Sequence, residues 1–128
     1  MAEEKKVILL VEDDKFLAEL YSTKLNLEGY ETDLATEGKK GLRMAKEKQY
    51  DLILLDVILP GMDGFEILKN LKSDKKTRGI PVILLTNLSQ KDEIMKGLEL
   101  GADDYLIKAH FMPSEVVKKI KQTINRDM

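Results

Sequence analysis

The sequence predicts a single α/β domain built on an open, parallel sheet with helices on both faces. Two observations predict this fold class. Short runs rich in Val, Ile and Leu alternate with stretches whose apolar residues recur at helical spacing, which is typical of βα units. Two of these runs, Leu52–Leu55 and Val82–Leu85, are continuously apolar, as expected of central parallel strands covered on both faces. Joined by right-handed crossovers, five such units form a doubly wound sheet.

The first half of the chain holds two of the units. A strand is expected at about Lys6–Val11, followed by a helix that Gly29 stops. The apolar face of this helix is expected to hold Phe16, Leu17, Leu20, Tyr21 and Leu25. A weaker, alternating strand at Tyr30–Ala35 indicates an edge of the sheet, and a helix at Gly38–Lys48 follows it.

The second half holds the other three units. Their strands are expected at Leu52–Leu55, Val82–Leu85 and Tyr105–Ile107. The helices after them are expected at Gly64–Ser73, from Asn87–Ser89 to Gly101, and from Pro113-Ser114 onward. Asp63 is expected to cap the helix that begins at Gly64, behind a Pro60-Gly61 turn.

Composition excludes several classes of function. The 128 residues, 43% hydrophobic and 34% charged, are expected to form one soluble domain over residues 1–128, with no output domain. The 21 basic residues against 23 acidic ones give no footprint for nucleic acid or an anionic membrane. The absence of cysteine excludes disulfide and thiolate chemistry. The first apolar run, Val7–Val11, is too short for a signal peptide or a membrane span, so a cytoplasmic location is expected.

Polar side chains gather where the predicted strands end. They are Glu12, Asp13 and Asp14 after the first strand, Asp56 after the third, Thr86 after the fourth and Lys108 after the fifth. Ligands of open parallel sheets bind beyond the carboxyl ends of the strands, near the point where strand order reverses. Carboxylates, a hydroxyl and an ammonium at one edge therefore indicate a site for a hard cation and an anionic group.

The chemistry of this set favours Mg²⁺ and a phosphoryl group. Carboxylates about 4 Å apart repel by roughly 4 kcal/mol per pair at an effective dielectric near 20, so the cluster needs a proton or a cation. Mg²⁺ prefers oxygen ligands and is commonly held by one or two carboxylates together with phosphate oxygens. A phosphoryl donor can then approach a carboxylate nucleophile, giving an aspartyl-phosphate. Lys108 and Thr86 would hold the transferred oxygens by charge and hydrogen bond.

These residues resemble the receiver domains of two-component response regulators, especially the stand-alone, chemotaxis-type receivers. The resemblance covers the whole chain, from VILLVEDD through LLDVILPGMDG and VILLTN to GADDYLIK. It implies a flavodoxin-like, three-layer αβα fold with five parallel strands in the order 2-1-3-4-5 and five helices. It also implies a phosphorylation-controlled switch, loaded by a histidine kinase and read by a downstream protein target.

The resemblance further implies a role for each gathered residue. The ligands of Mg²⁺ would be Glu12, Asp13, Asp56 and the backbone carbonyl of Ile58. Asp56 would accept the phosphoryl group, Thr86 would supply the hydroxyl that moves toward it, and Lys108 would be its counter-charge. Tyr105 matches the aromatic residue whose inward swing accompanies that move. The output face would comprise the fourth helix, the last strand and the last helix.

Two positions depart from the family pattern and keep an alternative open. Ala109 replaces the usual proline after the lysine, and a cis bond there would cost about 2.5 to 4 kcal/mol, so a trans bond is expected. Asn87 replaces the usual small residue after the threonine, and its amide could crowd the site. The alternative is a receiver-like interaction module that works without phosphorylation.

Other assignments explain fewer of the residues. Asp13 or Asp14 could merely cap the first helix. A flavin or nucleotide binder would want a Gly-rich or Ser/Thr-rich loop where acidic EDD stands. A haloacid-dehalogenase-type phosphatase would carry a second Asp where Ile58 stands. The resemblance to receiver domains implies that the chain catalyses its own phosphorylation and dephosphorylation at Asp56 without being a turnover enzyme. It is expected to be a monomer, with dimerisation on activation as an alternative.

Overall fold

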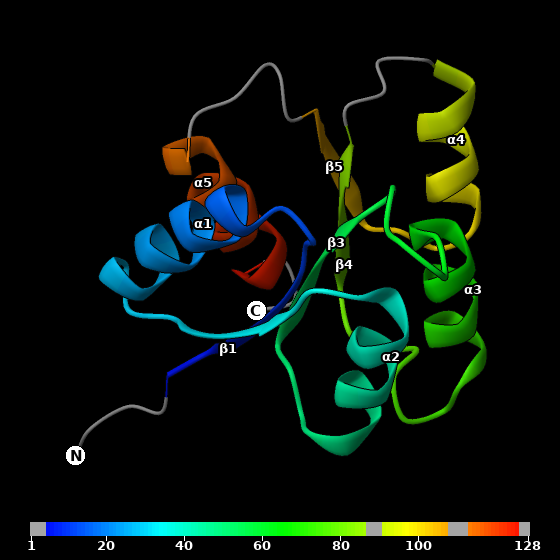
Figure 1. Ribbon diagram of the computed structural model, residues 1–128, viewed down its shortest axis with the longest axis horizontal. Helices are drawn as coiled ribbons and strands as arrows, with labels where there is room; N and C mark the ends of the chain where they lie inside the picture. The colour runs from blue at the N-terminus through cyan, green and yellow to red at the C-terminus, as the bar shows by residue number, and fades with distance from the viewer. Residues whose placement is uncertain (1–4, 87–90, 108–112, 126–128) are drawn as a thin grey trace.

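The computed structural model describes residues 5–86, 91–107 and 113–125, and within them five parallel strands form one sheet (Figure 1). The strands are β1 (Val7–Val11), β2 (Glu31–Ala35), β3 (Leu52–Asp56), β4 (Val82–Thr86) and β5 (Asp104–Ile107). The helices are α1 (Lys15–Leu27), α2 (Gly38–Glu47), α3 (Gly64–Ser73), α4 (Lys91–Glu99) and α5 (Pro113–Asn125). The order β2-β1-β3-β4-β5 confirms the predicted topology and places β2 at an edge.

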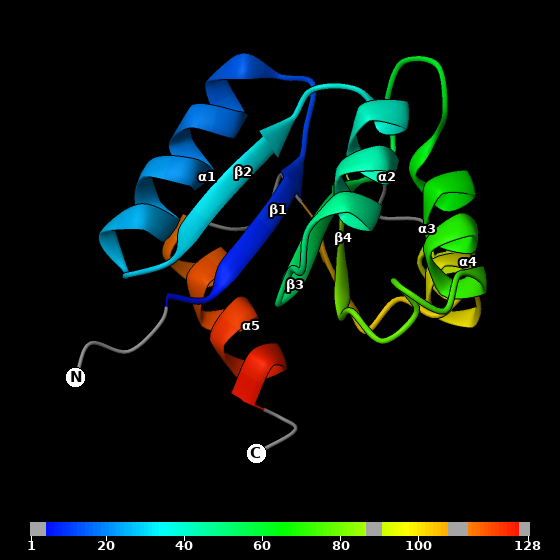
Figure 2. The ribbon, with the colours of Figure 1, turned by 90° about the horizontal axis from the view of Figure 1, so that it is seen from below.

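Helices cover both faces of the sheet and bury two apolar layers. Helices α1 and α5 lie on one face, and α2, α3 and α4 lie on the other (Figures 1 and 2). Successive residues of a strand point to opposite faces. Leu9 and Ile53 accordingly belong to the layer under α2 and α3, while Ile8 and Leu54 belong to the layer under α1 and α5. The continuously apolar central strands are explained by burial on both faces.

The topology brings two strand ends together at the edge of the sheet that carries the candidate site. After β1 the chain crosses to β2 on one side, and β3 then pairs with β1 on the other side. Val11 of β1 is paired with Leu55 of β3, so Glu12 and Asp56 follow at neighbouring positions. This reversal of strand order is where ligands bind in sheets of this kind.

Predicted turn and cap residues are found where the structure needs them. Gly29 and Gly61 have φ angles of 94° and 83°, which side chains disfavour, and they end α1 and complete the Pro60-Gly61 turn. Asp63 caps α3 by accepting a hydrogen bond from the Glu66 N–H at 2.9 Å. The predicted helix stop, turn and cap are all confirmed. Among the described helices, none combines the length and the apolar character that crossing a membrane requires.

The prediction for the buried face of α1 is wrong in part. The buried residues are Ala18, Tyr21 and Leu25, whereas Phe16 is 72% exposed and Leu20 is 38% exposed. Each of these two lies two positions from Ala18, which is about 200° around a helix. Phe16 and Leu20 therefore belong to a second apolar stripe on α1. The proposed opening of α4 at Asn87–Ser89 lies outside the described residues, and the described helix begins at Lys91.

Candidate functional site

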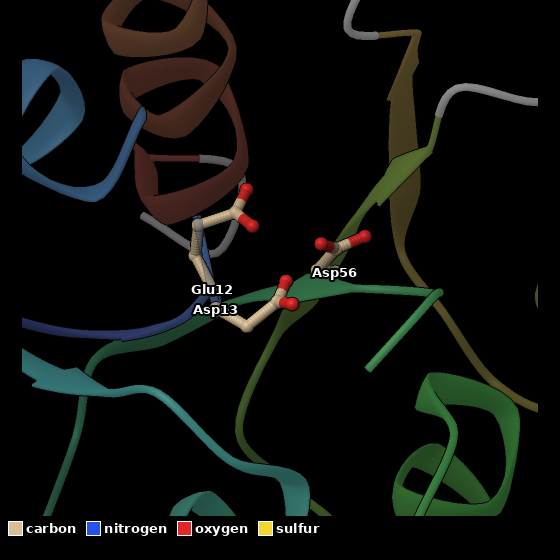
Figure 3. A group of neighbouring side chains, drawn as sticks. All are labelled: Glu12, Asp13 and Asp56. Carbon is tan, nitrogen blue, oxygen red and sulfur yellow. The ribbon is translucent and has the colours of Figure 1, made fainter. Parts of the chain in front are cut away.

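Three carboxylates converge at the carboxyl ends of β1 and β3 (Figure 3). Ligand oxygens of Glu12, Asp13 and Asp56 all lie within 4.8 Å of one another. Glu12 is fully buried and Asp56 is 4% exposed, while Asp13 lies at the surface. The cluster is therefore reached from solvent on the side of Asp13 and closed on the side of the sheet.

Backbone hydrogen bonds hold these acids in place. The Glu12 N–H donates to the Ala35 carbonyl at 3.0 Å, which ties the end of β1 to the end of β2. The Glu12 carboxylate accepts a hydrogen bond from the Asp14 N–H at 3.2 Å. The Asp56 Oδ1 accepts one from the Ile58 N–H at 3.1 Å. Each buried carboxylate is thus oriented by the main chain two residues further on.

The structure separates the two neighbouring aspartates by role. Asp14 caps α1, because its Oδ1 accepts a hydrogen bond from the Leu17 N–H at 3.1 Å. Asp13 instead joins Glu12 and Asp56 in the cluster. The open choice between these two as the helix cap is resolved in favour of Asp14.

The donor set fits a hard divalent cation. Burying a carboxylate is costly unless it is paired or bound to a metal, and here two buried carboxylates lie close to a third. Three oxygens within 4.8 Å can converge on one ion, and Mg²⁺ prefers such oxygen ligands. Ile58 follows two residues after Asp56 with its side chain 57% exposed. Its carbonyl as a further ligand stays a prediction.

Thr86 and Tyr105 line one cavity on the β4 side of Asp56. Thr86 is the last residue of β4 and is 4% exposed, while Tyr105 is half-buried on β5. Both line a small cavity of about 10 Å³ whose other lining residues are Val57, Phe65, Leu84, Glu93 and Ile94. The two predicted switch residues therefore share one packing environment beside the strand that carries Asp56.

Three predicted or questioned positions cannot be placed in this geometry. Lys108, Asn87 and Ala109 lie outside the described residues, so the predictions made for them stay predictions.

A groove on α1 was missed by the sequence interpretation. It has a volume of about 560 Å³ and is lined by Phe16, Glu19, Leu20, Thr23, Lys24, Leu27 and Ser114. Its most exposed apolar residues are Phe16 and Leu27, at 72% and 76%. The positions 16, 20, 23 and 27 follow helical spacing. A second stripe could therefore have been recognised, but the sequence analysis places Phe16 and Leu20 on the same face as Tyr21 and Leu25.

The fold and the cluster together define a class of protein. It is a doubly wound α/β domain with an acidic, cation-compatible site at its topological switch point. Residues 8–121 match the family described as the response regulator receiver domain. The chain belongs to this family, whose members serve two-component systems.

Known relatives agree with this assignment. The chain is 39% identical over 119 residues to the DNA-binding dual master transcriptional regulator RpaA of Synechocystis, covering 93% of this chain and 49% of RpaA. It is 40% identical over 119 residues to the transcriptional regulatory protein CusR of Escherichia coli, covering 93% of this chain and 51% of CusR. The chain thus spans about half the length of the curated relatives it matches.

A solved structure is similar over nearly the full length. The receiver domain of the sensor histidine kinase PA1611 from Pseudomonas aeruginosa has a TM-score of 0.86 and 30% identity, covering 94% of this chain and 98% of that one. That structure has a magnesium ion coordinated in its active-site cleft.

Proposed function

We propose that this chain is a switch controlled by Mg²⁺-dependent transfer of a phosphoryl group from a histidine kinase to Asp56. The observation that carries the proposal is the cluster of Glu12, Asp13 and Asp56, whose ligand oxygens lie within 4.8 Å of one another. Asp56 is the last residue of β3, and Thr86 is the last residue of β4, the strand that pairs with β3. Because Thr86 ends the neighbouring strand, we assign Asp56 as the nucleophile of this cluster.

The transfer step moves one phosphoryl group between two named atoms. A carboxylate oxygen of Asp56 forms the new O–P bond, and the N–P bond of the donor phosphohistidine breaks. The donor imidazole leaves with the electron pair of that bond. The Ile58 N–H, bonded to Asp56 Oδ1 at 3.1 Å, restricts rotation of the carboxylate and so orients it for attack.

Glu12, Asp13, Asp56 and the Ile58 carbonyl would hold the ion. When bound, Mg²⁺ neutralises part of the charge on the carboxylates and on the phosphoryl oxygens. Support for this ligand set comes from the burial of Glu12 and Asp56 and from the magnesium in the PA1611 receiver domain.

The switch would act through Thr86, Lys108 and Tyr105. A phosphoryl group adds negative charge and acceptor oxygens beside Thr86, whose hydroxyl would move toward it while Lys108 supplies the counter-charge. Tyr105 shares a cavity with Thr86 and would repack in response. The readout surface would be α4, β5 and α5, where Met95 and Leu98 are 46% and 42% exposed.

The partners we propose are proteins. The apolar groove on α1 begins at Phe16, three residues after Asp13, so a kinase helix seated there would lie next to the acid cluster. For output we propose a downstream protein target rather than nucleic acid, because basic and acidic residues are nearly balanced.

We further propose a cytoplasmic, monomeric domain that is not a turnover enzyme. The alternative that works without phosphorylation is not favoured, because the acids needed for phosphorylation are brought together.

Intact mass after incubation with acetyl phosphate tests the proposal. We expect one added phosphoryl group that depends on Mg²⁺ and is absent in Asp56→Asn. Labelling that persists in Asp56→Asn would move the acceptor to another residue. A wild-type chain that takes no label with acetyl phosphate or with a kinase would refute the proposed chemistry.

A further inference from the structure

Gly64, the first residue of α3, lies against the main chain that carries Asp56. A Cβ atom at this position would collide with the carbonyl oxygen of Asp56 and would lie 2.6 Å from Val57 Cα and 3.0 Å from Val57 O. Ordinary van der Waals contact begins at 3.4 Å, so the contact with Val57 Cα is 0.8 Å too short. All three neighbours are backbone atoms, which cannot turn aside as a flexible side chain can. The absence of a side chain at Gly64 therefore sets how closely α3 approaches the end of β3.

Hydrogen bonds hold the end of β3 to α3 on one side and to β4 on the other. The Gly64 N–H donates to the Val57 carbonyl at 2.7 Å, and the Val57 N–H donates to the Leu85 carbonyl of β4 at 2.9 Å. The Asp63 cap, bonded to the Glu66 N–H at 2.9 Å, holds the first turn of α3 in the same place. The segment after Asp56 is thus held between β4 and α3.

We propose that Gly64 is a positioning residue for Asp56. Because Gly64 has no side chain, the first turn of α3 can pack directly against the Asp56 backbone. This packing keeps the Asp56 carboxylate at its position beside Glu12 and Asp13. The inference rests on the proposed function and concerns where the nucleophile stands. Metal–ligand distances tolerate errors of only about 0.2 Å, and a misplacement of about 1 Å can slow a reaction by about a hundredfold. A strand end displaced by 0.8 Å is therefore expected to disturb both ion binding and transfer.

The test compares Gly64→Ala with a matched control, Gly29→Ala. Gly29 has a φ of 94° and no atom within 4 Å of the place that an added Cβ would take, so alanine there strains only the backbone at the far end of α1. For Gly64→Ala we expect a higher half-saturating Mg²⁺ concentration and acetyl phosphate labelling slowed by about tenfold to a hundredfold. For Gly29→Ala we expect a lower melting temperature with wild-type labelling and Mg²⁺ dependence.

Each outcome decides a different point. Wild-type labelling and Mg²⁺ dependence in Gly64→Ala would overturn the inference, and so would equal losses in both alanine variants, which would indicate general destabilisation. A wild-type chain that takes no label would instead refute the proposed function.

A measurement on the wild type covers the case in which Gly64→Ala does not fold. In a Mg²⁺ titration followed by amide NMR, we expect the Gly64 resonance to shift with the same half-saturation as that of Ile58, because Gly64 is bonded to the strand end. A Gly64 resonance that stays unchanged while Ile58 shifts would also overturn the inference.

Discussion

Replacing Asp56 by asparagine should stabilise the metal-free protein. The substitution keeps the shape of the side chain and an oxygen that can accept the Ile58 N–H, but it removes one negative charge. Two unit charges 4.8 Å apart repel by about 3.5 kcal/mol at an effective dielectric near 20. Asp56 takes part in two of the three pairs in the cluster. Because solvent screens the exposed Asp13, we expect a net gain of only about 1–2 kcal/mol, or about 3–10 °C in melting temperature.

Magnesium should reduce this difference. A Mg²⁺ concentration about ten times the dissociation constant stabilises the wild type by about 1.4 kcal/mol. The variant lacks one ligand charge, so its free energy of unfolding should rise by less. Thermal unfolding followed by circular dichroism, in EDTA and in millimolar MgCl₂, measures both effects. Asp63→Asn is the matched control, because it removes a carboxylate outside the cluster while keeping a capping side chain for α3. A variant no more stable than wild type in EDTA, or an equal Mg²⁺ shift in both chains, would refute the electrostatic reasoning.

Three further predictions follow from the switch, the sheet edge and the groove. Thr86→Ala should keep labelling but lose the response of the Tyr105 amide resonance to phosphorylation; a wild-type response would reject the coupling. Burial and the 2.8 Å hydrogen bond to Asp33 raise the pKa of Tyr50 from 10.0 to about 12. The protonated phenol thus stabilises the fold fully below pH 10, and this contribution is lost as the pH rises to about 12. In Tyr50→Phe the melting temperature should accordingly fall less steeply between pH 10 and pH 12 than in the wild type. An unchanged slope would contradict this role of Tyr50. Phe16→Asp should slow transfer from a histidine kinase by about tenfold while acetyl phosphate labelling and stability stay near wild type, because Phe16 is 72% exposed. Equal kinase transfer in both chains would remove the groove as the docking surface.

Much of this protein was determined by residues close together in the sequence. Continuous apolar runs predicted β3 and β4 as central strands, and the weak alternation at Tyr30–Ala35 predicted β2 as an edge. The acids, Thr86 and Lys108 were identified as candidate site residues because parallel strands all end at the same edge of a sheet. These features depend on the local spacing of apolar residues and on the rule that parallel strands end at one edge of the sheet. They can therefore be predicted from the sequence.

Tertiary structure alone decided the rest. Asp13 and Asp14 are chemically equal neighbours, and only the path of the chain into α1 gives the Leu17 N–H to Asp14 and leaves Asp13 to the cluster. Helix α1 has two apolar stripes, and packing against the sheet and α5 buried the one with Ala18 and exposed the one with Phe16. The demand for glycine at position 64 arises from backbone atoms of the strand end that α3 meets. In each case the outcome depends on a contact between segments that only the folded layers bring together. The distance between those segments cannot be read from the pattern of neighbouring residues in the sequence.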